Sequence, residues 1–138
     1  MKKEMFSTEI SILRDTFRRL LRRHAKTNII KLIDKTHPAD MALIFRYFND
    51  SEQDTVFAMM RPSEKTVEFL NELDEAITIR IVENETPSRI AEILEEASSN
   101  EQAYLMGLVE ETYAASVIDL FKAEEQEELE EMMAYPED

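Results

Sequence analysis

Nearly all of the side chains in this sequence that could do chemistry are carboxylates. Asp and Glu supply 30 of the 138 residues, whereas cysteine is absent and the only histidines are His24 and His37. Carboxylate oxygens suit Mg²⁺ and Ca²⁺, and Mg²⁺ commonly uses one or two of them while it keeps several waters. Zinc is not expected, because there are no thiolates and neither histidine has a partner at metal-ligand spacing. These residue types favour weak, hydrated sites for divalent cations, which would gain affinity when another acidic surface came close.

The motifs of common catalytic sites are missing. The sequence has no Gly-rich phosphate loop, no serine in a Gly-bracketed elbow and no cysteine nucleophile. His37 stands directly before Pro38, and we expect its side chain to bond the backbone at the start of a helix. We therefore expect a binding or regulatory domain and not an enzyme.

Charge is distributed unevenly along the chain. Residues 1–35 hold ten Lys or Arg against four acids, whereas residues 36–138 hold six against twenty-six. The resulting negative field disfavours nucleic acid as a partner, because its phosphates would be repelled. Cations and basic protein surfaces remain as partner classes, and simple solubility is the alternative explanation of the acidic helices.

Residues 1–24 are predicted to form a basic amphipathic helix. Apolar residues such as Leu13 and Phe17 follow one face. The other face carries five arginines: Arg14, Arg18, Arg19, Arg22 and Arg23. Such a helix could lie on anionic lipid or against an acidic partner. Alternatively, the arginines neutralise acids of the same chain, which we favour because the remainder of the chain offers abundant carboxylates.

The composition predicts an all-α fold. One glycine and four prolines are too few for the turns of an all-β protein, and the abundant Glu, Leu, Ile, Ala and Met favour helix. No apolar run approaches the roughly 20 residues of a membrane-spanning helix, so the given chain is expected to be soluble.

A hydrophobic signature that returns four times indicates the architecture. Its first positions are 25, 24 and 27 residues apart. Repeats of this length are typical of stacked helix pairs. We expect about ten short helices in a solenoid, with the repeats in residues 25–122 and an acidic connector helix in residues 123–138. The four copies are Met41-Ala42-x-Ile44-Phe45, Thr66-Val67-x-Phe69-Leu70, Ile90-Ala91-x-Ile93-Leu94 and Val117-Ile118-x-Leu120-Phe121. The residues expected to be buried are Met41, Ile44, Phe45, Phe69, Leu70, Ile93, Leu94, Leu120 and Phe121.

Proline and capping residues predict where the helices begin. The first helix of a repeat should open at a proline, and Ala114 replaces the proline in the fourth repeat. The second helices should start at residues that cap well. The prolines are Pro38, Pro62 and Pro87, and the capping residues are Ser51, Asp74 and Ser99 or Asn100.

Several landmarks in a fixed order resemble a known family. His37-Pro38-Ala39-Asp40 leads into an apolar helix, Ile93-Leu94-Glu95-Glu96 lies in the third repeat, and Ala134-Tyr135-Pro136-Glu137-Asp138 ends the sequence. Over about residues 25–138 this pattern resembles the cytoplasmic N-terminal domain of MgtE-type magnesium transporters. The abrupt ending also leads us to expect a longer parent protein.

The resemblance implies a fold, a partner and a role. In that family the domain is a right-handed superhelix, and Mg²⁺ ions bridge its carboxylates to a pair of CBS domains in the same polypeptide. The bridged, compact state closes a transmembrane pore. For this chain the resemblance implies a weak Mg²⁺ site that needs the CBS partner. It also implies a parent protein that is a membrane homodimer, with this domain on the cytoplasmic side.

The resemblance also implies site residues. A family glutamate in the second repeat corresponds to Glu68. A family pattern of an acidic pair and a third acid corresponds to Asn100, Glu101 and Tyr104, so only Glu101 keeps its carboxylate. Glu68 and Glu101 are therefore the candidate metal ligands. The neighbouring Glu95 and Glu96, together with Glu101, could compensate for the missing acids.

A second hypothesis requires no cation. The family's helical repeats are also similar to those of flagellar motor-switch proteins, and fold does not determine function. The chain could therefore be a protein-interaction scaffold that does not sense cations. CBS domains and several hydrophobic spans downstream would favour the transporter.

Overall fold

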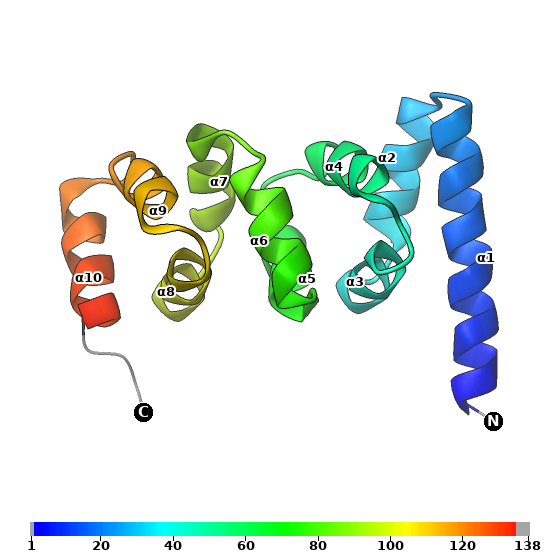
Figure 1. Ribbon diagram of the computed structural model, residues 1–138, viewed down its shortest axis with the longest axis horizontal. Coiled ribbons are helices and arrows are strands. Elements are labelled where there is room, and N and C mark those ends of the chain that lie inside the picture. Colours follow the sequence, from blue (N-terminus) through cyan, green and yellow to red (C-terminus); the bar gives the residue numbers. More distant parts are fainter. Residues whose placement is uncertain (1, 135–138) are drawn as a thin grey trace. The chain divides into compact units, whose positions relative to one another are not determined.

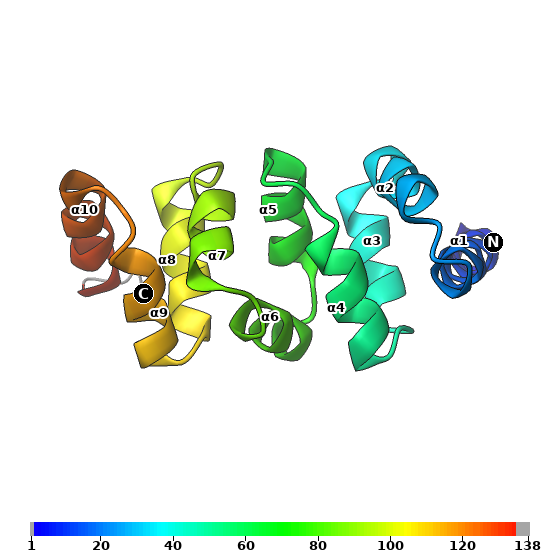
Figure 2. The same cartoon turned by 90° about the horizontal axis from the view of Figure 1, so that it is seen from above.

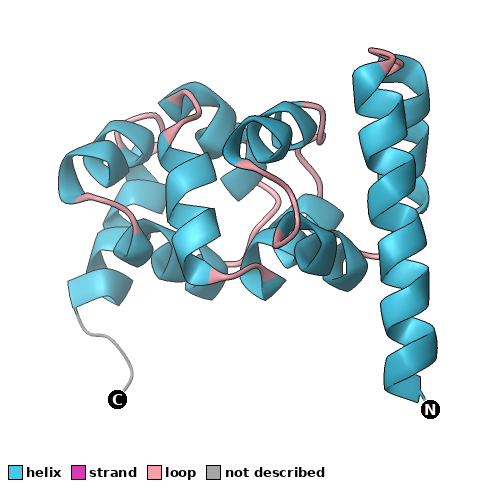
Figure 3. Cartoon of the chain, turned by 45° about the vertical axis from the view of Figure 1, so that its right-hand side comes forward, coloured by secondary structure: helices cyan, strands magenta, loops and turns pink. Residues whose placement is uncertain are grey.

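The computed structural model describes the backbone of residues 2–134 and the side chains of residues 8–134. This part of the chain forms ten α-helices and no strand (Figure 3), which confirms the all-α prediction. None of these helices is both long enough and apolar enough to cross a membrane. The helices are α1 (Lys2–Arg22), α2 (Lys26–Lys35), α3 (Pro38–Phe45), α4 (Asp50–Ala58), α5 (Glu64–Glu72), α6 (Glu75–Glu83), α7 (Pro87–Leu94), α8 (Ser99–Leu108), α9 (Glu111–Ile118) and α10 (Ala123–Ala134).

The helices belong to two compact units, and each unit is described by itself. The first unit holds the residues up to Met60 together with Glu68–Asp74. The second unit holds Arg61–Val67 and the residues from Glu75 onward.

In the first unit, α1 and α2 run antiparallel and α1 also packs on α3 (Figures 1 and 2). Aromatic rings fill the core of this unit. Phe45 and Phe69 meet edge to face with their ring centroids 4.7 Å apart, and Phe57 stacks on Phe69 at 6.3 Å. Phe48 joins Phe17 of α1 to this cluster through a contact of 6.1 Å. The apolar stripe of α1 is thus one wall of the core, as its sequence pattern predicts.

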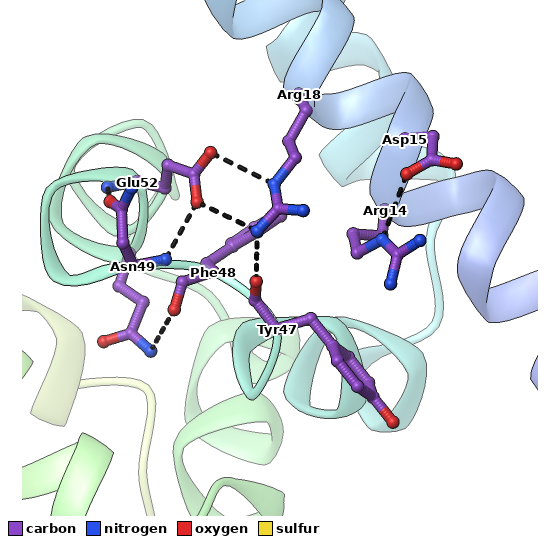
Figure 4. A network of polar contacts seen from close by, with 8 residues as sticks. Arg14, Asp15, Arg18, Tyr47, Phe48, Asn49 and Glu52 are labelled. Carbon is purple, nitrogen blue, oxygen red and sulfur yellow. Dashed lines mark hydrogen bonds and ion pairs between the residues drawn. The ribbon is translucent and has the colours of Figure 1, made fainter.

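One arginine of α1 is bound within the same unit. The Nε atom of Arg18 lies 3.2 Å from Oε2 of Glu52, and its guanidinium also donates to the carbonyl oxygen of Tyr47 (Figure 4). The ion pair is partly buried, so solvent screens it less than an exposed pair. This contact confirms for Arg18 the prediction that the basic helix neutralises acids of the same chain.

Two of the prolines open helices as predicted. His37 is the N-cap of α3, and its Nδ1 atom accepts a hydrogen bond of 3.1 Å from the backbone N–H of Ala39, which confirms the role expected for this histidine. Thr86 caps α7 in the same way directly before Pro87. Pro62 does not open α5, because the hydroxyl of Ser63 accepts from the backbone N–H of Thr66 and the helix begins only at Glu64.

Two predicted capping residues were wrong by one or two positions. Asn49 caps α4 and Ser98 caps α8, instead of Ser51 and Ser99 or Asn100. In each case an acid three residues after the cap bonds back to the N–H of the capping residue, which makes a reciprocal capping box. The helices begin where both bonds can form. Helix α6 begins directly after Asp74, as predicted.

Three glutamines, each directly after a glutamate near the start of a helix, donate a hydrogen bond to the end of the preceding helix or to the turn after it. The amide of Gln53 donates to the carbonyl oxygen of Phe45 at 2.8 Å, and Gln102 donates to that of Leu94 at the same distance. Gln126 donates to the carbonyl oxygen of Phe121, also at 2.8 Å. These groups are among the last carbonyls of a helix or of the turn after it, which have no partner within the helix. We call these three residues the helix-closing glutamines.

The fourth copy of the signature is shifted by three residues from its predicted position. Helix α9 has Glu110 as its N-cap, so counting from the cap places Ala114 where Met41 and Ile90 stand in α3 and α7. Ala114 and Val117 are buried, whereas Leu120 is 54% exposed. Two predictions were therefore wrong: that Leu120 is buried, and that Ala114 takes the place of the proline.

The other predicted core residues agree with the structure, except that Phe121 is only half-buried. The buried ones are Met41, Ile44, Phe45, Phe69, Leu70, Ile93 and Leu94. In the second unit, the acidic helix α10 packs on α8 and buries Leu129. The hydroxyl of Ser99 donates to Glu128 across this contact, at 3.2 Å. The Tyr135–Asp138 element lies outside the described residues.

Candidate functional site

Glu68 is exposed beside the start of another helix. It stands on α5 next to Phe69 and Leu70, whose burial in the core directs the carboxylate outward. Its side chain is 53% exposed, and its Oε2 atom lies 4.0 Å from Nε2 of His37. Because Nδ1 of His37 accepts the capping bond, the neutral ring carries its proton on Nε2 and presents it to Glu68.

This arrangement suits a hydrated divalent cation. An exposed carboxylate can supply one oxygen to Mg²⁺, while the ion keeps several of its waters. The N–H of His37 can hold the second carboxylate oxygen or a bound water, and His37 is itself held by the cap of α3. The predicted ligand Glu68 is thus accessible, with a hydrogen-bond donor beside it.

Glu101 already has a structural partner. It is the third residue of α8, and its Oε1 atom accepts a hydrogen bond of 2.8 Å from the backbone N–H of Ser98. Glu52 makes the equivalent bond in α4, and Glu125 accepts from the N–H of Lys122 at the start of α10. A metal ion at Glu101 would share a carboxylate that the helix end also uses.

Sequence reasoning expected capping boxes one or two positions later, in Ser51–Asp54 and Ser99–Gln102, and it missed the bonds of the glutamines, although a signal was present. The dipeptide Glu-Gln occurs at residues 52–53, 101–102 and 125–126. In each copy the Glu closes a capping bond and the Gln bonds the preceding helix or turn. Polar residues that recur at the repeat period, as well as apolar ones, therefore indicate contacts that build the repeat.

The two other positions of the expected acidic pattern, Asn100 and Tyr104, carry no charge. Asn100 is exposed, and Tyr104 is 39% exposed with its hydroxyl 3.5 Å from Oε2 of Glu75. Burial raises the pKa of Tyr104 above its ordinary value, and the negative charge of Glu75 raises it further. The hydroxyl is therefore a neutral donor to a carboxylate at neutral pH.

Glu95 lies at a small hollow in the second unit. The hollow has a volume of about 120 Å³, and Lys122 and Glu125 also line it. Its remaining lining residues are Ala91, Gln102, Leu120 and Phe121. Lys122 is the only cation after residue 91. Its backbone N–H donates to Oε1 of Glu125 at 3.3 Å, so one of the two carboxylates at the hollow already serves the start of α10.

The described residues contain no group of three or more His, Cys, Asp and Glu side chains arranged to hold a metal ion. Glu68 belongs to the first unit and Glu101 to the second. Each candidate ligand is thus a single carboxylate within its own surroundings.

Tyr113 of α9 lies close to two glutamates, Glu83 and Glu85, whose charges affect its pKa. Its hydroxyl donates to the carbonyl oxygen of Glu85 at 2.8 Å. Burial raises the pKa of Tyr113 from 10.0 to about 12, and the charges of Glu85 and Glu83 contribute. Glu83 also accepts a hydrogen bond of 2.8 Å from the backbone N–H of Glu110, the N-cap of α9.

We expect Tyr113 to lose its proton at a higher pH in the folded than in the unfolded protein. Between pH 10 and about 12 only the unfolded state loses this proton, so the stabilisation from Tyr113 is complete below pH 10 and disappears across that interval. Absorbance titration of tyrosinate should show the late step, and Tyr113→Phe should remove it. Glu85→Gln should move the step to lower pH, and an unmoved step would contradict the part assigned to that charge.

Comparison with known proteins gave one match. Residues 36–138 match the model of the family described as the MgtE intracellular N domain. No curated protein and no solved structure matched the chain. The matched segment begins directly before His37 and contains both Glu68 and Glu101, whereas α1 lies outside it.

Proposed function

Because this chain belongs to the family of MgtE intracellular N domains, we propose that it is the magnesium-sensing regulatory domain of a magnesium transporter. It would lie on the cytoplasmic side of the membrane, in a parent protein that is a homodimer. The observation that carries the proposal is the position of Glu68, an accessible carboxylate inside the matched segment with the N–H of His37 beside it.

In this proposal Mg²⁺ acts as a bridge between two acidic surfaces. Glu68 supplies one oxygen, water supplies several ligands, and carboxylates of CBS domains in the same polypeptide supply the others. Residues 36–138 hold twenty-six acids against six Lys or Arg, so the two surfaces repel until a divalent ion lies between them. The ion then stabilises the compact state, and its concentration sets how much of the protein has a closed pore.

We also place the helix pairs in a right-handed superhelical solenoid. Support comes from local contacts that recur after one or two repeat lengths. The caps Asn49 and Ser98 are 49 residues apart, and the helix-closing glutamines are 49 and 24 residues apart. Units that share one internal design tend to stack in one repeated way.

Glu101 has a smaller part in the proposal. Its Oε1 atom accepts a hydrogen bond from the N–H of Ser98, so an ion bound at Glu101 would share the carboxylate with the cap of α8. The neutral side chains of Asn100 and Tyr104 add no negative charge beside it. We therefore expect a weaker contribution to Mg²⁺ binding from Glu101 than from Glu68.

The test compares the shape of two versions of the protein by small-angle scattering. A version that continues into the CBS domains should become more compact in about 20 mM Mg²⁺, whereas residues 1–138 should bind in roughly the millimolar range without changing shape. Glu68→Gln should raise the Mg²⁺ concentration at half-compaction several-fold. Glu72→Gln is the matched control, because this glutamate is also exposed and lies one turn away on α5.

The scaffold without cation sensing remains the second candidate. The engagement of Glu101 in the capping box of α8 favours it, because a purely structural role explains that residue fully. If the longer version does not compact and Glu68→Gln behaves like Glu72→Gln, the sensor should be abandoned in favour of the scaffold.

A further inference from the structure

Four cations gather where α1 ends and α2 begins. Arg19 and Arg22 lie in the last turn of α1, Arg23 follows directly after the helix, and Lys26 is the first residue of α2. All four side chains are exposed. We call these four residues the basic corner, and it lies at the turn between the two antiparallel helices (Figure 1).

The backbone holds the corner in a defined conformation. His24 has a φ of 55°, the left-handed region, and the N–H of Ala25 bonds the carbonyl oxygen of Leu20 at 3.0 Å. The N–H of His24 donates to the carbonyl oxygen of Leu21 at 3.1 Å. This pattern of bonds ends α1 and reverses the chain, so Lys26 follows Arg23 closely in space.

The basic corner differs from the rest of α1 in its partners. Arg18 is committed to Glu52, and Arg14 lies beside Asp15 at 3.0 Å. Among the described residues, Arg22, Arg23 and Lys26 form no ion pair with a carboxylate.

The surroundings of the basic corner add little negative charge. Residues 19–35 contain six Lys or Arg and a single acid, Asp34. The first turn of α2 has no acid, and its N-cap, Ala25, provides no side-chain bond. The positive end of the α2 dipole therefore adds positive potential beside Lys26.

We propose that the basic corner docks on the anionic surface of a phospholipid bilayer. A compact cluster of cations on a helix is typical of binding to anionic headgroups, and each cation near such a surface strengthens binding about fivefold. The corner has no aromatic side chain on which a nucleic-acid base could stack. The family match begins at Thr36, so this inference goes beyond the proposed magnesium function.

The acidic remainder of the chain does not prevent this contact. Exposed charges farther apart than about 10 Å are largely screened at 0.1 M salt, so the surface acts mainly on the nearest side chains. Binding should therefore depend on the corner more than on the net charge of −14. It should weaken steeply as salt is added.

Co-sedimentation with vesicles tests the proposal. Residues 1–138 should bind vesicles in which about one lipid in three is phosphatidylglycerol, and not vesicles of phosphatidylcholine alone. Combining Arg22→Gln with Arg23→Gln should weaken binding on the order of 30-fold. The matched control combines Arg46→Gln with Lys122→Gln, which changes the net charge equally at two exposed cations outside the corner, and it should bind nearly as the original does.

Three results would overturn the proposal. These are equal binding to both kinds of vesicle, equal loss in the two double variants, and self-association that requires Arg22 and Arg23 while vesicles stay unbound. The last result would show that the corner binds the acidic part of a second copy. A chelator of divalent cations is present throughout, so vesicle binding is measured independently of magnesium sensing, and either proposal can fail alone. Thermal unfolding of both variants should match that of the original protein, since these side chains are exposed.

Discussion

Replacing Phe69 by alanine should lower the free energy of unfolding by about 3–5 kcal/mol. Phe69 is 2% exposed. Its ring centroid lies 4.7 Å from that of Phe45 and 6.3 Å from that of Phe57, both in the first unit. Its removal loses both the burial of a large apolar side chain and the edge-to-face contact, and it leaves a cavity that the helices cannot close fully. Urea unfolding followed by helical circular dichroism measures the change.

A pair of leucines provides the control. Leu94→Ala should cost about 2–5 kcal/mol, because Leu94 is fully buried at the end of α7. Leu120→Ala should cost less than about 0.5 kcal/mol, because Leu120 is 54% exposed. Equal losses at the two leucines would contradict the shifted position of the fourth repeat.

Replacing Gln53 by leucine should cost about 1–3 kcal/mol, although it adds an apolar side chain to an apolar core. Gln53 is 5% exposed, and its amide donates to the carbonyl oxygens of Phe45 at 2.8 Å and Phe48 at 3.3 Å. Leucine leaves both carbonyls without this donor, and water reaches them poorly in the core. Thermal or urea unfolding gives the difference in stability.

Gln126→Leu is the matched control for this prediction. Gln126 makes the equivalent bond to the carbonyl oxygen of Phe121, but the residue is only half-buried. Water can replace the lost donor there, so the loss should be well under that at Gln53. If both variants were as stable as the original protein, the helix-closing glutamines would be incidental contacts.

Much of the fold could be predicted because local apolar spacing determines which face of a helix is buried. The last two apolar positions of the first and third copies of the signature are buried, as their helical spacing predicts. These residues are Ile44, Phe45, Ile93 and Leu94. The capping role of His37 could be predicted because the proline after it limits the backbone at that point.

The fourth repeat shows where this reasoning fails. Ala114-Ala115-x-Val117-Ile118 and Val117-Ile118-x-Leu120-Phe121 have the same apolar spacing and differ by about one helical turn. The frame with larger side chains fits the signature better, yet α9 begins at Glu111 and buries Ala114 and Val117 of the smaller set, with Ile118 half-buried and Ala115 exposed. Apolar spacing alone cannot decide which of the two sets is buried, because that depends on where the preceding turn ends and the helix begins.

The candidate site could be predicted only residue by residue. The exposure of Glu68 follows from the burial of its neighbours on α5, and that much the sequence pattern contains. The engagement of Glu101 depends on whether Ser98 or Ser99 caps α8, and the two adjacent serines leave this open in the sequence. The metal role of both residues stays a prediction, because the proposed remaining ligands belong to a different surface.

Three helix pairs have their ends bonded by residues of the same pair, and this has a consequence for how such a domain can evolve. Residues such as Glu52 and Gln53 satisfy the helix ends of their own repeat, so stability depends little on the outward-facing positions. Those positions can drift, since surface substitutions usually change stability by less than about 0.5 kcal/mol. Asn100 is one of these exposed positions, and the resemblance described above implies an acid at its place in the family. Under the proposed function, single substitutions at such places would change the range of magnesium concentrations to which the protein responds and leave its folding unchanged.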